Sequence, residues 1–189
     1  MSTLETNQVD PATGTTLTLG TSGDTITIPS GVTIANSGTA TGFGANTPAF
    51  QGYYSSSYQT VSDNTATKLT IDTEEFDTSS AFDTSTSRFT IPSGQAGKYF
   101  LYTKFYTYSS NDTGRQAKIY IYKNGSATSP TDNQYRLTQD SIVGGALYTS
   151  YIYDASVGDY FEAYGNFNVN SGTDNRLYKA SFGGYKLIT

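Results

Sequence analysis

The sequence predicts an almost entirely β protein, and three observations support this prediction. Thr, Ser, Gly, Asn and Tyr dominate the composition, and these residue types favour strands and turns over helices. No window of a dozen residues shows a helical period of apolar side chains. From residue 49 onward, short apolar alternations are divided by turn clusters, a pattern typical of sandwiches and jelly rolls. We therefore expect a jelly-roll sandwich preceded by a short intertwined β-stalk.

Composition and charge exclude several classes of function. The chain of 189 residues has a formal net charge of −5 and contains no His or Cys. No Lys/Arg cluster could displace counterions from phosphates, so we expect no nucleic-acid partner. Residues 1–10 lack the basic and apolar regions of a signal peptide, and no stretch is long enough to insert in a membrane. Synthesis in a cytoplasm, together with the composition of an exposed surface protein, favours a virus particle assembled inside its host.

The first 48 residues divide into three expected segments. Residues 1–14 have few apolar anchors and are expected to be an N-terminal attachment peptide that orders only against a partner; a frayed terminus is the alternative. Residues 15–38 contain three short strand-like alternations, each closed by a glycine turn. Residues 39–48 are small and glycine-punctuated, as is typical of a linker. The head domain is expected to occupy residues 49–189.

Each alternation in residues 15–38 brings two apolar side chains to one face, which is too little to fold alone. Several copies wound around a common axis would bury these side chains, as in the intertwined trimeric β-stalks of viral fibres. An arm that lies on the following domain is the alternative. The residues expected at this trimer interface are Leu17, Leu19, Ile26, Ile28, Val32 and Ile34.

The head is expected to be a succession of short strands. Asn124-Gly125 fits the positive φ angles of a tight turn, and Val157-Gly158-Asp159 marks a second turn. Residues 126–141 are predicted to form a long exposed loop. The expected strands span residues 49–56, 60–61, 68–74, 88–91, 98–108, 115–123, 147–153, 160–166 and 178–187.

The longest of these strands is rich in aromatic and apolar side chains on both faces. Tyr99 and Leu101 lie on one face, whereas Phe100, Tyr102 and Tyr106 lie on the other. A strand that is apolar on both sides needs cover on both sides. The second face therefore meets another sheet of the same chain or another subunit.

A series of motifs in the head resembles the trimeric jelly roll of complement component 1q heads and tumour necrosis factor. The resemblance covers residues 48–187, and no collagen repeats precede it. The stalk that takes their place is similar to segments of bacteriophage tail-fibre and virion-surface proteins. The motifs, in order, are Pro48-Ala49-Phe50, Leu69–Asp77 with Phe82-Asp83, Phe89–Gly94, Gly97–Leu101, Ile121–Gly125, Val157–Phe161 and Phe182–Leu187.

The resemblance implies a threefold oligomer. Its inner sheet would contain the strand that begins at Gly97 together with the last strand of the chain. Tyr99 and Leu101 would then enter the core, and the opposite face of the strand would pack toward the threefold axis. A loop of the same chain over that face is the alternative. The head residues expected at the trimer interface are Phe100, Tyr102 and Tyr106.

Catalysis is difficult to build from this sequence because a chain without His or Cys lacks the most common bases and nucleophiles. The densest acidic stretch carries Asp72, Glu74 and Asp77, and Asp83 follows it. Two such carboxylates could serve a glycosidase, and several could bind Ca²⁺. We expect instead a solvated strand and turn, and hence no catalytic residue, no cofactor and no metal ion.

Two Asn-x-Ser/Thr sequences begin at Asn111 and Asn124, and both are expected to be unmodified turns. Tyr135, in the predicted loop, could stack on the face of a sugar.

The sequence as a whole predicts a non-enzymatic, homotrimeric virion protein of a bacteriophage, either a fibre, a spike or a decoration of head or tail on the virion surface. Its N-terminal segment would bind other virion proteins, and its distal head would contact a host-surface glycan or protein. One alternative is a polysaccharide-degrading tail-spike enzyme that uses Asp72, Glu74 or Asp77. A secreted bacterial adhesin is the other.

Overall fold

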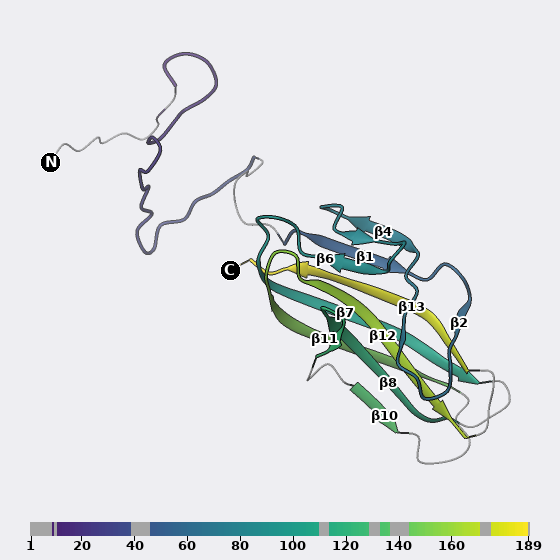
Figure 1. Cartoon of the computed structure of the whole chain (residues 1–189). Helices are drawn as coiled ribbons and strands as arrows, with labels where there is room; N and C mark the ends of the chain where they lie inside the picture. The colour runs from purple at the N-terminus through teal and green to yellow at the C-terminus, as the bar shows by residue number, and fades with distance from the viewer. Residues whose placement is uncertain are drawn as a thin grey trace. The chain divides into compact units, whose positions relative to one another are not determined.

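The computed structural model describes residues 9, 11–38, 46–109, 114–128, 133–136, 144–170 and 175–188. The chain divides into two compact units, Met1–Phe43 and Gly44–Thr189. The second unit, the head, consists of two antiparallel β-sheets (Figure 1).

Sheet A has six strands. They are β1 (Ala49–Tyr53), β2 (Tyr58–Thr60), β4 (Thr73–Asp77), β7 (Gly97–Ser109), β11 (Gly144–Ala155) and β13 (Asn175–Lys186). Their order is β11-β7-β13-β1-β4, and β2 pairs with β13 outside this path. The strand that begins at Gly97 and the last strand therefore lie side by side, as predicted.

Sheet B has seven strands. They are β3 (Thr67–Lys68), β5 (Phe82–Asp83), β6 (Arg88–Thr90), β8 (Gly114–Lys123), β9 (Ser126–Ala127), β10 (Asn133–Arg136) and β12 (Tyr160–Val169). Their order is β10-β8-β12-β6-β5, with β3 on β12 and β9 on β8. The prediction of an all-β sandwich is confirmed.

The core lies between the two sheets and is built largely from aromatic rings. Tyr99 and Leu101 of β7 are fully buried, as predicted, because alternate side chains of the strand point inward. Phe50 of β1 stacks on Phe89 of β6 with ring centroids 4.2 Å apart, which ties the first strand of sheet A to sheet B. The ring of Phe182 on β13 meets the Phe50 ring edge-on, with centroids 5.1 Å apart. Such aromatic pairs add to the stability that burial alone supplies.

Two of the predicted segments differ from the structure. The strand expected at residues 68–74 is divided into β3 and β4, because the backbone of Leu69 bonds to Ala163 of sheet B while that of Ile71 bonds to the hydroxyl of Ser87. The loop expected at residues 126–141 contains β9 and β10. Both strands extend sheet B along the edge formed by β8.

The tight turn at Asn124-Gly125 is confirmed. Both residues have positive φ angles, 52° and 78°, as the turn requires. Gly158 in the second predicted turn has a φ of 84°. The described residues contain no helix long and apolar enough to cross a membrane.

The first unit has no strand between residues 11 and 38. Its backbone hydrogen bonds close local turns, such as Asp24 N to Thr21 O at 3.0 Å and Val32 N to Pro29 O at 3.2 Å. The three short strands expected here are not formed in the single chain, because no neighbouring strand supplies partners for their backbone groups. The attachment peptide, apart from Val9 and residues 11–14, and residues 39–45 of the linker lie outside the described residues.

Candidate functional site

The candidate site is the outer face of sheet A, the face that points away from the core. The alternate side chains of β7 line it: Phe100 and Tyr102 are half-buried, whereas Tyr106 is 46% exposed and Tyr108 38%. Among the residues that the structure describes, none covers the end of the face around Tyr106. The predicted alternation of β7 is therefore correct.

Neighbouring strands add aromatic and apolar side chains to this face. Strand register places Ile152 and Tyr185 on either side of Phe100. Farther along the strand, the register places Tyr178 beside Tyr106. Several large hydrophobic side chains of sheet A are exposed, and extended patches of exposed apolar surface mark interaction surfaces. Those on the outer face that are at least 36% exposed are Tyr53, Tyr58, Phe76, Tyr106, Tyr108, Tyr148 and Ile152.

Tyr102 is fixed at the centre of the face by a chain of hydrogen bonds. Its hydroxyl donates to Gln51 Oε1 at 2.7 Å, and Gln51 Nε2 donates to Glu75 Oε2 at 2.9 Å. Burial raises the pKa of Tyr102, and the nearby Tyr148, Glu75 and Tyr185 raise it further. Tyr102 therefore stays neutral and remains a hydrogen-bond donor.

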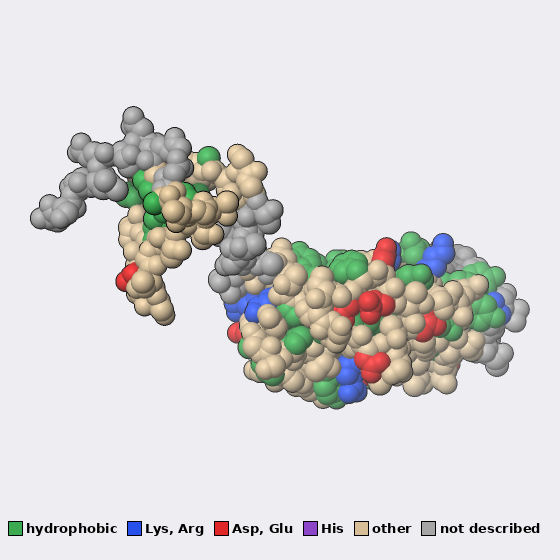
Figure 2. Space-filling view, turned by 90° about the horizontal axis from the view of Figure 1, so that it is seen from above, with side chains coloured by type: hydrophobic (Ala, Val, Ile, Leu, Met, Phe, Trp, Pro, Cys, Tyr) green, Lys and Arg blue, Asp and Glu red, His purple; other side chains and the backbone are tan. Residues whose placement is uncertain are grey.

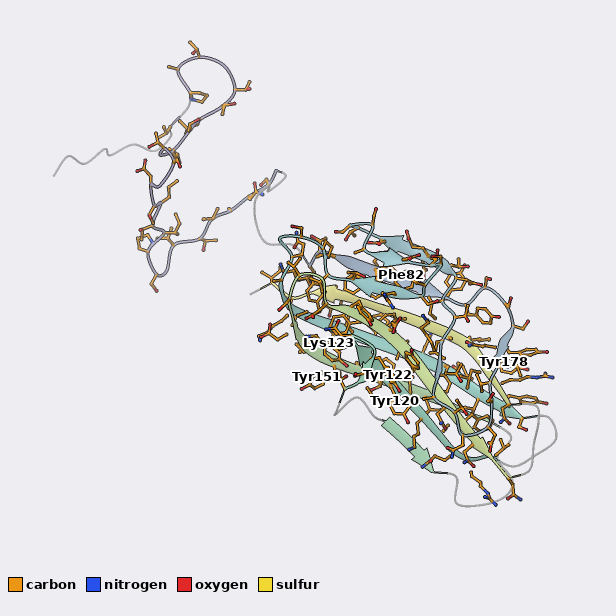
Figure 3. All side chains as sticks on the ribbon, in the orientation of Figure 1. Phe82, Tyr120, Tyr122, Lys123, Tyr151 and Tyr178 are labelled. Carbon is orange, nitrogen blue, oxygen red and sulfur yellow. The ribbon has the colours of Figure 1, made fainter. Side chains whose placement is uncertain are left out.

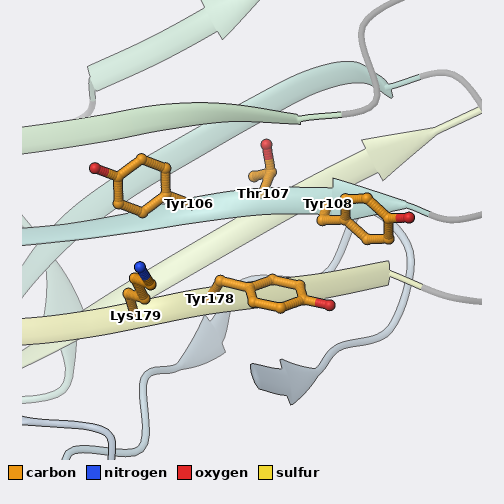
Figure 4. Close-up of a pocket in the computed structure, with 5 residues that line it drawn as sticks. All are labelled: Tyr106, Thr107, Tyr108, Tyr178 and Lys179. Atoms are coloured by element: carbon orange, nitrogen blue, oxygen red, sulfur yellow. The ribbon is translucent and has the colours of Figure 1, made fainter. Parts of the chain in front are cut away.

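A β-bulge interrupts the pairing of β13 with β7 between Tyr178 and Ser181. Within it, Lys179 has a φ of 50°, a left-handed conformation that is uncommon for lysine. Beside the bulge lies a hollow of about 440 Å³ (Figure 4). Tyr106, Thr107, Tyr108, Tyr178 and Lys179 line it, and it is called the tyrosine hollow below.

A second hollow of about 440 Å³ adjoins the tyrosine hollow, with which it shares Tyr106 and Lys179. Its wall brings a carboxylate, Glu75, and a second cation, Lys104, to the same depression. The remaining lining residues are Gln51, Tyr53, Tyr54, Ala180 and Ser181. The bulge thus lies at a concave region of the sheet face, since Lys179 lines both hollows.

Among the described side chains, stacked rings and ion pairs cover the outer face of sheet B. Tyr122 and Tyr164 stack with ring centroids 3.8 Å apart, and Figure 3 shows Tyr120 beside Tyr122 on the same strand. Glu162, only 3% exposed, bonds to Arg88 at 3.0 Å and to Lys68 at 3.3 Å. The rings stack on one another and the charged groups pair, so this face offers less open apolar surface than sheet A.

The acidic stretch organises turns. Asp77 accepts hydrogen bonds from the backbone N–H groups of Ser79, Ala81 and Phe82. Asp83 accepts from Ser85 and Thr86, and these bonds lower its pKa, with that from the Ser85 hydroxyl contributing most.

The Asp72 carboxylate accepts hydrogen bonds from the backbone N–H and the hydroxyl of Ser55. Glu74 is exposed on β4. Within the described parts of the chain, no three acidic side chains are placed to hold a metal ion.

The remaining predicted residues fall in different places. The six apolar residues of the first unit are all exposed, from 43% for Leu17 to 64% for Ile34. Asn111 lies outside the described residues, and Asn124 occupies its predicted turn. Tyr135 lies on β10, opposite Ala117, and its side chain is outside the described atoms. Figure 2 shows acidic and basic side chains scattered over the visible face of the head among uncharged ones.

Comparison with known proteins identifies the fold. No known family model and no curated protein matches the sequence. Among solved structures, the globular domain of zebrafish complement 1qA matches with a TM-score of 0.52 and 15% sequence identity. The match covers 75% of this chain and 98% of that domain. The head is a jelly-roll sandwich similar to a complement 1q globular domain. At this identity the likeness shows the fold alone.

Proposed function

We propose that the chain is a structural, homotrimeric virion protein of a bacteriophage: a fibre, a spike or a decoration of head or tail. The first unit would form an intertwined stalk attached to other virion proteins, and the head would contact the host surface. The observation that carries this proposal is that one chain exposes two separate apolar surfaces, one in each unit, that a second copy could bury.

The first unit supports the proposal through its exposed side chains. Leu19, Ile26, Val32 and Ile34 are each more than half exposed, and the segment that carries them has only local turn bonds. Burial of apolar surface contributes roughly 25 cal/mol per Å², so copies wound together would stabilise what one chain cannot. Repeated Thr and Gly around these residues suit strands that pack closely.

The outer face of sheet A supports the same assembly. Phe100, Tyr102 and Tyr106 occupy the central part of the face on β7, and Tyr185 on β13 packs beside Phe100 with centroids 5.5 Å apart. Aromatic residues are enriched at the buried centres of protein interfaces. A threefold contact centred on Phe100, Tyr102 and Tyr185 would remove these rings from water, with Tyr106 at its margin beside the tyrosine hollow.

The decisive experiment is the mass of the full chain in solution, measured by light scattering after size exclusion. A trimer that persists at low micromolar concentration is expected. A stable monomer would overturn both the stalk and the interface. The double variant Ile26→Asp/Ile34→Asp should weaken the stalk contact. It should leave the fold of the head intact, because neither residue lies in the head.

The virion assignment has its own test, which is to locate the protein on purified particles with an antibody raised against the head. Labelling of the particle surface is expected. Cleavage of a host polysaccharide that is lost in Asp72→Asn or Glu74→Gln would instead support the tail-spike enzyme.

A further inference from the structure

The tyrosine hollow combines flat aromatic walls with a cation. The ring centroids of Tyr178 and Tyr108 are 5.7 Å apart in an edge-on arrangement, and those of Tyr178 and Tyr58 are 5.2 Å apart. Figure 4 shows Tyr106, Tyr108 and Tyr178 around the hollow with Lys179 beside them. Its volume of about 440 Å³ lies within the range of small-ligand sites.

Lys179 is held in a strained conformation, and its charge has no partner among the described residues of the head. Its side chain is exposed, and no described residue forms a hydrogen bond or ion pair with its ammonium group. Bulges often redirect a side chain at a functional site, and a lysine with a φ of 50° costs energy that a regular strand would avoid.

Charge in the joined hollows favours an anion. No carboxylate lines the tyrosine hollow among the residues described there, while Lys104 adds a second ammonium group in the adjoining hollow. The carboxylate of Glu75 in that hollow already accepts a hydrogen bond from Gln51. Among the described lining residues, two ammonium groups and one carboxylate therefore share the joined hollows, which leaves a net positive charge there.

We propose that the tyrosine hollow binds a carboxylated sugar residue of an acidic glycan. Tyrosine rings pack on the apolar face of a pyranose and offer hydroxyl groups to its oxygens. The ammonium of Lys179 would pair with the carboxylate. This inference rests on the proposed function, since contact with a host surface gives the glycan its source.

The position of the hollow suits such contact. The chain enters the head at Ala49, which pairs with Tyr185 near the end of β13. Tyr178 lies near the other end of that strand, away from the chain entry (Figures 1 and 3). The hollow is therefore at the end of the head away from the point where the chain enters it.

The test compares sugars that differ only in charge. Binding of methyl β-D-glucuronide and methyl β-D-glucoside, and of the methyl α-glycoside of N-acetylneuraminic acid and the methyl ester of that glycoside, is measured by NMR titration of the full chain. At least one acidic probe should bind at least tenfold more tightly than its neutral counterpart. Lys179→Gln should reduce this preference to within about twofold, and Tyr178→Ala should abolish binding of both members of the pair.

Lys98→Gln serves as the matched control, because it removes an exposed lysine at the opposite end of β7. It should leave the preference unchanged. Equal binding of the acidic and neutral members in both pairs would overturn the inference, and so would a preference that survives Lys179→Gln. Variants of Tyr178 and Lys179 that alter the mass of the assembly but not sugar binding would assign the hollow to a contact between copies.

Failure of this inference can be separated from failure of the proposed function. A trimer without preference for acidic sugars refutes only the glycan site. A monomer that still prefers the acidic member of a pair refutes only the trimer.

Discussion

The ring of Tyr102 lies directly over the backbone of Gly183. A Cβ atom added to this glycine would be 2.6 Å from the Tyr102 hydroxyl oxygen and 2.7 Å from its Cζ atom. The absence of a side chain on β13 therefore lets Tyr102 cross that strand and reach Gln51 on β1. The next residue, Gly184, faces the core, where a Cβ would be 2.4 Å from Leu101 Cδ2.

Alanine at these two glycines is expected to have different effects. Gly183→Ala should displace Tyr102, cost about 1 kcal/mol through its lost hydrogen bond, and weaken self-association. Gly184→Ala should overpack the core and destabilise the head by about 1–3 kcal/mol. Urea unfolding followed by tyrosine fluorescence measures both. Gly145→Ala is the control, since nothing lies within 4 Å of its Cβ position. Equal losses for all three variants would contradict this account.

Tyr102→Asp should dissociate the proposed trimer without unfolding the head. A carboxylate at the centre of a buried contact would be desolvated without a partner, which costs several kcal/mol. Light scattering measures the mass, and circular dichroism checks the fold. Val157→Asp, at a 52% exposed position in the turn between β11 and β12, should leave the mass unchanged. A soluble trimer formed by Tyr102→Asp would show that the outer face has been assigned wrongly.

Glu162→Gln should destabilise the head by about 1–3 kcal/mol, because Arg88 and Lys68 would lose their shared anionic partner. The side chain of Glu162 is 4% exposed, so water cannot replace the lost interaction fully. Asp154→Asn breaks a pair whose members are 53% and 81% exposed, and should have almost no effect. Equal losses of unfolding free energy in the two variants would show that burial does not control the strength of these ion pairs.

Asp159 should make stability depend on acidic pH. Hydrogen bonds from Lys123 and then Asn124 lower the pKa of Asp159 to about 2. Because the folded pKa is below the unfolded one, the stabilisation is complete above about pH 4 and is lost as the pH falls toward 2. The expected loss is about 1–2 kcal/mol after solvent screening. Asp159→Asn should flatten this part of the stability curve, whereas an unchanged slope would exclude Asp159 as its source.

Much of the head could be predicted because its determinants are local. Alternation assigned the faces of β7 correctly, and Asn124-Gly125 specified its turn through backbone geometry. The acidic stretch was correctly expected to form a strand and turn. The backbone hydrogen bonds that Asp77 accepts could not be predicted, because they depend on a turn whose path the sequence does not reveal.

The features that escaped prediction depend on pairing between distant segments. The bulge at Lys179 has no local mark, since neither a glycine nor an asparagine stands there, and it arises from the register of β13 against β7. The burial of Glu162 likewise requires Lys68 and Arg88, which are far away in sequence. The short strands expected in residues 15–38 need partners that one chain does not contain, so their pairing stays a prediction.

The antiparallel neighbours β1 and β13 also determine how the head would bear a mechanical load. Pulling on Ala49 while the Tyr178 end is held would slide these strands past each other. Their five paired positions, from Ala49 with Tyr185 to Tyr53 with Ser181, would then be strained together instead of peeling one after another. A head attached through its first strand is thus loaded in shear, and the unfolding rate under force would reflect rupture of the whole ladder.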